Sequence, residues 1–211
     1  MSQLDIFNYT PILNFTNKKP KELHTIENGE YIYCPNYFDR IESDLYFKKL
    51  KEGAIWKQET MNMYGKKIDF PRLTSWYGES DKPYTFSGIT LHPHPWTKEI
   101  IEIKNKVENK ASTYFNSVLL NRYRDGNDSI SWHTDAEKEL GLNPIIASVN
   151  FGATRKFQLR HVKTKEKLEI ELTHGSLLIM QGELQHFWQH QVPKTSKPIG
   201  ERINLTFRVI K

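Results

Sequence analysis

The sequence predicts an α+β, mainly β protein in which two outer helices support a double-sheeted β core. The first observation is that the chain from Ser117 onward consists of short alternating or apolar runs, separated by turn residues such as Asp125-Gly126 and His174-Gly175. Many short strands at regular spacing are typical of a β sandwich or barrel. The second observation is that two segments upstream carry apolar residues at helical spacing. The expected strands are SVLLNRY, SISWH, IIASVNF, RKFQLRH, KLEIEL, SLLIM and RINLTFRVI.

The elements before Ser117 follow in chain order. Residues 1–30 show no regular pattern and are expected to form an irregular leader. A helix is expected next, because Asp39 and Glu42 have capping-box spacing and Gly53 can end it. The residues expected on its apolar face are Phe38, Ile41, Leu45 and Leu50.

Residues 54–90 predict short strands, because glycines and prolines interrupt them repeatedly. A second helix is expected to start after Thr97, with lysines opposite its apolar face. The residues expected on that apolar face are Ile100, Ile103, Val107, Ala111 and Tyr114.

The composition is that of an ordinary globular protein, with 37% hydrophobic, 26% charged and 12% aromatic residues. Its 211 residues suit one domain. Cys34 is the only cysteine, so no disulfide framework exists, and the N-terminal residues lack the pattern of a signal peptide. Both features predict an intracellular, cytoplasmic protein, and no apolar stretch is long enough to span a membrane. The net charge of +5 permits a polyanionic partner without requiring one.

His133 and Asp135 lie two residues apart in SISWHTD, at the expected end of a strand. Residues two apart on a strand point to the same face, so both side chains can reach one metal ion. Alone, the pair is weak support, because chance produces about 0.3 such pairs in a chain of this composition. A solvated histidine hydrogen-bonded near a turn is the competing interpretation.

A third residue strengthens the metal interpretation. His190 lies in the run HFWQHQVP, beyond several expected strands. Two histidines and one carboxylate, with other coordination positions open, are the ligands that non-haem Fe(II) oxygenases use. A helical zinc pair of His186 and His190 is the alternative, but Phe187 stands where a zincin motif needs glutamate.

The last expected strand, RINLTFRVI, has one apolar and one polar face. Its polar face begins with Arg202 and ends with Arg208, which lie about 20 Å apart along a strand. Each side chain reaches roughly 6 Å, so about 8 Å separates the two guanidinium groups, a gap that fits a short dicarboxylate. Pairing of each arginine with an acidic residue on a neighbouring strand is the alternative.

Five ordered motifs resemble those of the AlkB family of 2-oxoglutarate and Fe(II)-dependent dioxygenases: NRYRDGNDSISWHTD, PIIASVNFGATRKFQLRH, HGSLLIM, QHFWQHQVPK and RINLTFR. The resemblance covers roughly residues 55–210 and points to the DNA-repair branch, which contains the human nuclear homologues and their bacterial relatives. It implies a double-stranded β-helix (jelly-roll) core over residues 117–211. That core would belong to a single dioxygenase domain, residues 31–211, in which residues 54–90 form a nucleotide-recognition lid.

The resemblance also implies the site and the reaction. His133, Asp135 and His190 would bind Fe(II), and Arg202 would pair with the distal carboxylate of 2-oxoglutarate. The implied cosubstrate-binding residues are Asn121, Tyr123, Arg202, Asn204 and Arg208. The implied reaction is oxidative removal of an N-alkyl group from a nucleic-acid base, expected to be in DNA, with release of succinate, carbon dioxide and aldehyde. The protein is expected to act as a monomer.

For the substrate, the resemblance implies that Phe86 stacks on a flipped base and that Tyr64 enters the gap left in the duplex. Lys66, Lys67 and Arg72 would contact phosphates. The alternative is that Phe86 and Tyr64 are ordinary core or surface aromatics. The full implied set of substrate-binding residues is Tyr64, Arg72, Tyr84, Phe86, Ser87 and Glu137.

Ala136 departs from the family pattern, because the repair branch commonly has an acidic residue there that helps to read the base edge. The preferred base is therefore not predicted. Two rival functions remain: an Fe(II) and 2-oxoglutarate oxygenase acting on RNA, a protein side chain or a lipid, and a non-catalytic β-sandwich binding module. The aromatic and basic residues of the expected lid favour a nucleic-acid substrate. The binding module predicts no metal binding, so a metal titration separates it from the enzymes.

Overall fold

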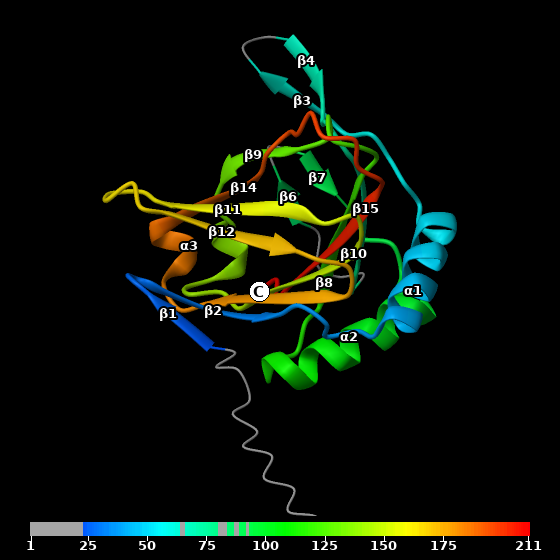
Figure 1. Cartoon of the computed structure of the whole chain (residues 1–211), viewed down its shortest axis with the longest axis horizontal. Helices are drawn as coiled ribbons and strands as arrows, with labels where there is room; N and C mark the ends of the chain where they lie inside the picture. The colour runs from blue at the N-terminus through cyan, green and yellow to red at the C-terminus, as the bar shows by residue number, and fades with distance from the viewer. Residues whose placement is uncertain (1–22, 64–65, 80–83, 87–88, 92) are drawn as a thin grey trace, which may run out of the picture.

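The computed structural model describes residues 23–63, 66–79, 84–86, 89–91 and 93–211, and its core is a pair of β sheets packed face to face (Figure 1). In spatial order, the larger sheet contains β1 Leu23–Ile26, β2 Gly29–Cys34, β13 Ser176–Gln181, β10 Ile146–Gly152, β15 Arg202–Arg208, β8 Ser117–Tyr123 and β5 Leu73–Gly78. The smaller sheet contains β12 Lys167–Leu172, β11 Arg155–His161, β14 Trp188–Val192 and β9 Ile130–His133. Neighbouring strands in both sheets run antiparallel. The predicted double-sheeted, jelly-roll fold class is confirmed.

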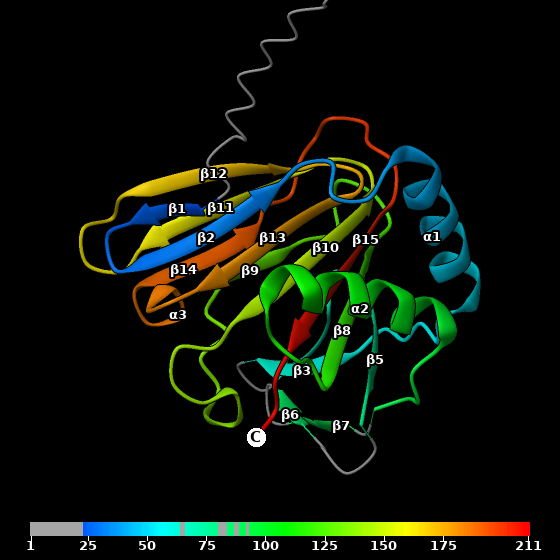
Figure 2. The same ribbon diagram turned by 90° about the horizontal axis from the view of Figure 1, so that it is seen from below.

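Helices and two small hairpins surround these sheets. The helices are α1 Arg40–Gly53, α2 Lys98–Ala111, the short α3 Leu184–Phe187 and the 3-10 helix η1 Lys138–Leu140. The hairpins are β3 Thr60–Met63 with β4 Lys66–Asp69, and β6 Tyr84–Phe86 with β7 Ile89–Leu91. The longer helices α1 and α2 lie on one side of the larger sheet (Figure 2), and the β3–β4 hairpin projects from the body of the molecule (Figure 1). None of the described helices is long and apolar enough to cross a membrane.

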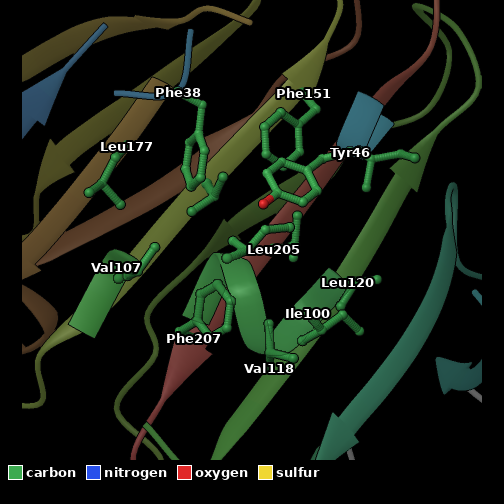
Figure 3. Close-up of a cluster of buried hydrophobic side chains, with 14 of the residues drawn as sticks. Phe38, Tyr46, Ile100, Val107, Val118, Leu120, Phe151, Leu177, Leu205 and Phe207 are labelled. Atoms are coloured by element: carbon green, nitrogen blue, oxygen red, sulfur yellow. The ribbon is translucent and has the colours of Figure 1, made fainter. Parts of the chain in front are cut away.

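The two faces of the larger sheet have different neighbours, and β15 shows this most clearly. Ile203, Leu205 and Phe207 belong to the hydrophobic cluster between this sheet and helices α1 and α2 (Figure 3). Arg202 and Arg208 instead line a pocket between the two sheets. Because alternate residues of a strand point to opposite faces, the predicted apolar and polar faces are both confirmed. The polar face is directed toward the smaller sheet, where it can contribute to a site.

Helix α1 begins as predicted, with a capping box. The Asp39 carboxylate accepts from the Glu42 N–H at 2.8 Å, and the Glu42 carboxylate accepts from the Asp39 N–H at 3.2 Å. Its predicted apolar face is partly wrong, because Ile41 and Leu45 are 82% and 49% exposed. The face turned toward the core is centred on Tyr46, which packs in the cluster under the helix (Figure 3).

Helix α2 also begins as predicted, directly after its N-cap Thr97, whose hydroxyl oxygen accepts from the Ile100 N–H at 3.4 Å. The helix ends at Ala111, because Ser112 takes a left-handed conformation with φ of 50°. Tyr114 therefore lies beyond the helix and is 62% exposed, so its predicted place on the apolar face is wrong.

Residues 23–30 correct the expected irregular leader, because they form β1 and the beginning of β2. The two strands are joined by the turn Glu27-Asn28, in which Asn28 has a φ of 52° that asparagine tolerates better than most residues. The side chains of β1 are mostly exposed, so the segment lacks the apolar alternation that marks a strand. Residues 1–22 lie outside the described part of the chain.

Candidate active site

The three predicted metal ligands converge at the edge of the smaller sheet. His133 is the last residue of β9 and His190 is its partner on the neighbouring strand β14. Asp135 lies two residues beyond the end of β9, so the pair meets although only His133 belongs to the strand. Their candidate ligand atoms all lie within 4.8 Å of one another, a spacing that one ion can bridge with bonds of about 2 Å.

Hydrogen bonds orient two of these side chains. The Nδ1 atom of His133 lies 2.8 Å from the carbonyl oxygen of Ser131, so it donates there and leaves Nε2 with its lone pair. Arg208 donates from Nη2 to Oδ2 of Asp135 at 2.9 Å, which leaves Oδ1 available. The two available atoms, His133 Nε2 and Asp135 Oδ1, lie 3.8 Å apart and face each other.

The electrostatic surroundings keep Asp135 and His190 in the protonation states that metal binding requires. Burial opposes ionisation of Asp135, but Arg208 and the two imidazoles outweigh it and hold the pKa of the carboxyl well below its usual range. Burial, together with His133, lowers the pKa of His190 to about 3. At neutral pH the site therefore offers a carboxylate and a neutral imidazole at these two positions.

Gln185, in the short helix α3, holds the backbone of one predicted metal ligand, Asp135. Its Oε1 accepts from the Asp135 N–H at 2.9 Å, and its Nε2 donates to the sulfur of Met180 at 3.6 Å. The side chain is 1% exposed. Sequence reasoning missed this residue, because nothing in the local pattern marks a glutamine whose partner lies 50 positions earlier in the chain.

A pocket extends from His133, Asp135 and His190 across the polar face of the larger sheet. Its apolar lining residues are Leu119, Ile130, Phe157, Met180 and Val192. Its polar side forms a buried hydrogen-bond network, in which Asn204 donates to Ser148 at 2.8 Å and to Asn150 at 3.3 Å. Ser148 and Asn150 were also missed. They alternate with apolar residues along β10, so the same period-two pattern that identified the polar face of β15 could have found them.

Arg202 lies in this pocket with two donors unused. It is 2% exposed, and its Nη2 donates to Asn150 Oδ1 at 2.5 Å. Its Nε and Nη1 are buried and have no hydrogen-bond partner among the described residues. The guanidinium lies over the ring of Tyr123, 4.9 Å from its centre, and burial lowers the pKa of Arg202 to about 10, so the group is still charged at neutral pH. A buried cation with unused donors is suited to bind a carboxylate.

The other predicted cosubstrate residues line the same pocket: Asn121, Tyr123, Asn204 and Arg208. Arg72 lines it too, which corrects its predicted contact with phosphates. Arg72 is 4% exposed, and its guanidinium donates a hydrogen bond to Asn121 inside the protein. A sequence shows that an arginine is charged but not whether it is buried.

The remaining predicted substrate residues are described only in part. Tyr64 and Ser87 lie outside the described residues, and Tyr84 and Phe86 are described only as parts of the strand β6. Glu137 precedes η1, two residues after Asp135. Its Oε2 is buried without a partner among the described residues.

Comparisons with known proteins agree with this geometry. The family model for the 2OG-Fe(II) oxygenase superfamily matches residues 30–208. The mouse protein named DNA oxidative demethylase ALKBH2 is 38% identical over 207 residues, which are 92% of this chain and 85% of that protein. This chain belongs to the AlkB family of 2OG-Fe(II) oxygenases. The family confirms the predicted resemblance and makes Fe(II) and 2-oxoglutarate the expected cofactor and cosubstrate.

Other relatives of this AlkB-family chain differ in length. The bovine protein named alpha-ketoglutarate-dependent dioxygenase alkB homolog 3 is 44% identical over 187 residues, and the human protein of that name is 42% identical over 186 residues. The matches cover 84% and 83% of this chain but only 65% and 64% of the relatives, so the chain spans about two thirds of their length. The solved structure of OsALKBH1 has a TM-score of 0.61 at 15% identity and covers 89% of this chain and 99% of that one. At that identity the likeness shows a shared fold.

The residues present fit the groups that the family implies. Two imidazoles and one carboxylate are a ligand set that suits Fe(II), and all three line a partly apolar pocket. The unused donors of Arg202 suit a carboxylate of 2-oxoglutarate.

Proposed function

We propose that this chain removes N-linked alkyl groups from bases of nucleic acid, with DNA as the preferred polymer. The reaction would consume 2-oxoglutarate and O₂, with Fe(II) as the cofactor, and would release succinate, carbon dioxide and an aldehyde. The observation that carries the proposal is one pocket that contains His133, Asp135 and His190 together with the unused donors of Arg202. The names of the relatives, which describe dioxygenases and DNA demethylases, support this choice of substrate.

In this proposal His133, Asp135 and His190 hold the metal, and the rest of the chain keeps them in place. Arg208 fixes one carboxylate oxygen of Asp135, and Gln185 fixes its backbone N–H. When bound, Fe(II) with 2-oxoglutarate supplies the oxidation of the alkyl C–H bond, after which the hydroxylated alkyl group leaves the base as an aldehyde.

The cosubstrate is assigned to the polar face of β8 and β15. Arg202 would pair with the distal carboxylate of 2-oxoglutarate, and Asn121 and Tyr123 would form hydrogen bonds with 2-oxoglutarate. Asn204 is held by Ser148 and Asn150 and lines the pocket between Arg202 and the metal ligands. The apolar residues that line the pocket exclude water, which strengthens each charged contact inside it.

The alkylated base is assigned to the mouth of the pocket, beside the metal ligands. Phe86 would stack on the base, with Tyr84 and Ser87 nearby, and Tyr64 would fill the gap that the base leaves in a duplex. Glu137 would accept a hydrogen bond from the base, because its buried Oε2 has no partner among the described residues. Arg72 is reassigned to the interior of the pocket.

Release of succinate and aldehyde tests the proposal. Matched oligonucleotides would carry one N-methylated base in single-stranded DNA, duplex DNA or RNA, and a methylated peptide would represent the rival substrate class. We expect equimolar aldehyde and succinate from methylated DNA and neither product in excess of background from the unmethylated strand. Product from the peptide alone would replace nucleic acid with protein as the substrate.

A further inference from the structure

Arg72 occupies a junction between three segments of the chain. It lies just before β5, where the β3–β4 hairpin returns to the larger sheet, and its guanidinium lines the pocket. Its Nε donates to Oδ1 of Asn121 on β8 at 2.8 Å, and its Nη1 donates to the carbonyl oxygen of Ser129, just before β9, at 3.4 Å. The backbone N–H of Ser129 in turn donates to the carbonyl oxygen of Pro71 at 2.8 Å.

The bond to Asn121 has a consequence for the direction of that amide. A guanidinium N–H can only donate, so the atom of Asn121 that faces Arg72 must be the carbonyl oxygen. The NH₂ end of the same amide then points the other way, where it lies 3.4 Å from Oδ1 of Asn204. Oδ1 of Asn204 also accepts from the Thr206 hydroxyl at 3.0 Å, which agrees with its role as an acceptor.

An amide held in this direction offers a donor to a ligand in the pocket. The NH₂ group has two hydrogens, and the contact with Asn204 uses one of them. Both Asn121 and Arg72 are buried, at 5% and 4% exposure, so water does not compete freely for these atoms. If Arg72 were absent, only the 3.4 Å contact with Asn204 would hold the amide in this direction. A rotation by half a turn would place the amide oxygen toward the pocket, where it would repel a carboxylate.

We propose that Arg72 is a positioning residue for the cosubstrate, which fixes the amide of Asn121 with its N–H groups directed into the pocket. The role rests on the proposed function, because that function assigns Asn121 to 2-oxoglutarate. It replaces the phosphate contact first predicted for this arginine, and it accounts for a buried cation whose nearest side-chain partner is an uncharged amide.

A double-mutant cycle tests whether Arg72 acts through Asn121. The variants are Arg72→Met, Asn121→Leu and the double variant, and the measurement is the Kd of 2-oxoglutarate by calorimetry with saturating Mn(II). We expect Arg72→Met to raise the Kd about tenfold in the wild-type background, which corresponds to about 1.4 kcal/mol. In the Asn121→Leu background it should raise the Kd less than twofold, because the amide that it orients is gone. Arg72→Lys, which also only donates, should recover most of the affinity.

The matched control is Arg122→Met. Arg122 is the neighbour of Asn121 on β8, but it pairs with Glu201 at 2.7 Å. We therefore expect Arg122→Met to leave the Kd of 2-oxoglutarate unchanged. Melting temperatures of all variants would be recorded, and Arg72→Gln, whose amide can either donate or accept, replaces Arg72→Met if that protein does not fold. An equal increase in Kd in both backgrounds, or none in the wild type, would overturn the positioning role. Absence of 2-oxoglutarate binding by the wild-type protein would instead refute the proposed function on which the role rests.

Discussion

Arg202 and Arg155 are two buried arginines over the same Tyr123 ring, 4.9 and 5.5 Å from its centre, and they differ in their hydrogen bonds. Arg155 donates to the backbone carbonyl oxygens of Asp125, Asp128 and Pro193. Arg202 donates to Asn150 and keeps two buried N–H groups without a partner among the described residues. If the unused donors of Arg202 bind a ligand, Arg202→Met should weaken ligand binding with little change in stability. Arg155→Met should instead lower the stability and leave ligand binding intact.

The magnitudes follow from these contacts. Burial lowers the pKa of Arg202 to about 10, a depression that corresponds to roughly 3 kcal/mol against the charged side chain in the folded protein. Arg202→Met removes that penalty and loses one charge-assisted hydrogen bond, worth ~1.5–3 kcal/mol. We therefore expect the free energy of unfolding of the ligand-free variant to stay within about 1 kcal/mol of the wild-type value. Arg155→Met leaves three carbonyl oxygens without their donor and should lower the melting temperature by roughly 6 °C or more.

Thermal unfolding with Mn(II), with and without 2-oxoglutarate, measures both effects. A ligand at a hundred times its Kd stabilises a protein by about 2.7 kcal/mol, so the wild-type melting temperature should rise clearly. Without 2-oxoglutarate, the Arg155→Met protein should have a lower melting temperature than the wild type, and 2-oxoglutarate should still raise it. The Arg202→Met protein should have a melting temperature near that of the wild type, and 2-oxoglutarate should raise it much less. The reasoning would be refuted if Arg202→Met were as unstable as Arg155→Met and 2-oxoglutarate still raised its melting temperature as much as in the wild type. That result would show that Arg202 is a structural residue.

Three further changes test other parts of the structure. Arg208→Met should weaken Mn(II) binding about tenfold or more in calorimetry, because Asp135 loses the partner that orients its carboxylate. An unchanged affinity would show that the Arg208–Asp135 pair does not contribute to metal binding. Asp39→Ala should lower the free energy of unfolding by about 1 kcal/mol in urea titrations, since it removes the N-cap of α1, and a change near zero would show that Glu42 alone suffices. Ala136→Asp should change the ratio of activity on methylated adenine to that on methylated cytosine, because one base-edge contact is worth ~1–3 kcal/mol, and an identical ratio would show that the position does not read the base.

The sequence predicted most strands from Ser117 onward well, because each is a short alternating or apolar run between turn residues. It missed β1, whose side chains are mostly exposed, and β14, whose run HFWQHQVP contains as many polar as apolar residues. It placed the apolar face of α1 partly on Ile41 and Leu45, because helical spacing shows which residues share a face but not which face meets the sheet.

The site was predicted to a similar extent. His133, Asp135 and His190 were chosen by ligand chemistry and lie together, and Arg202 lies in the same pocket. Arg208 was expected to face one end of a dicarboxylate, but it pairs with Asp135 at 2.9 Å, which is the alternative that the sequence left open. Residues that act through other residues were harder to find. Gln185 has a hydrogen-bond partner 50 positions away in the sequence. Arg72 was expected at the surface because it is charged, but it is buried.

Metal stoichiometry tests most directly whether His133, Asp135 and His190 form one metal site. Calorimetric titration of Mn(II) into metal-free protein should give one ion per chain for the wild type. Binding should be lost in His190→Ala and Asp135→Asn, while His186→Ala, which changes an exposed histidine four positions before His190, should bind one ion like the wild type. One ion per chain in all four proteins, with the same affinity, would contradict the assignment of the metal to these three residues.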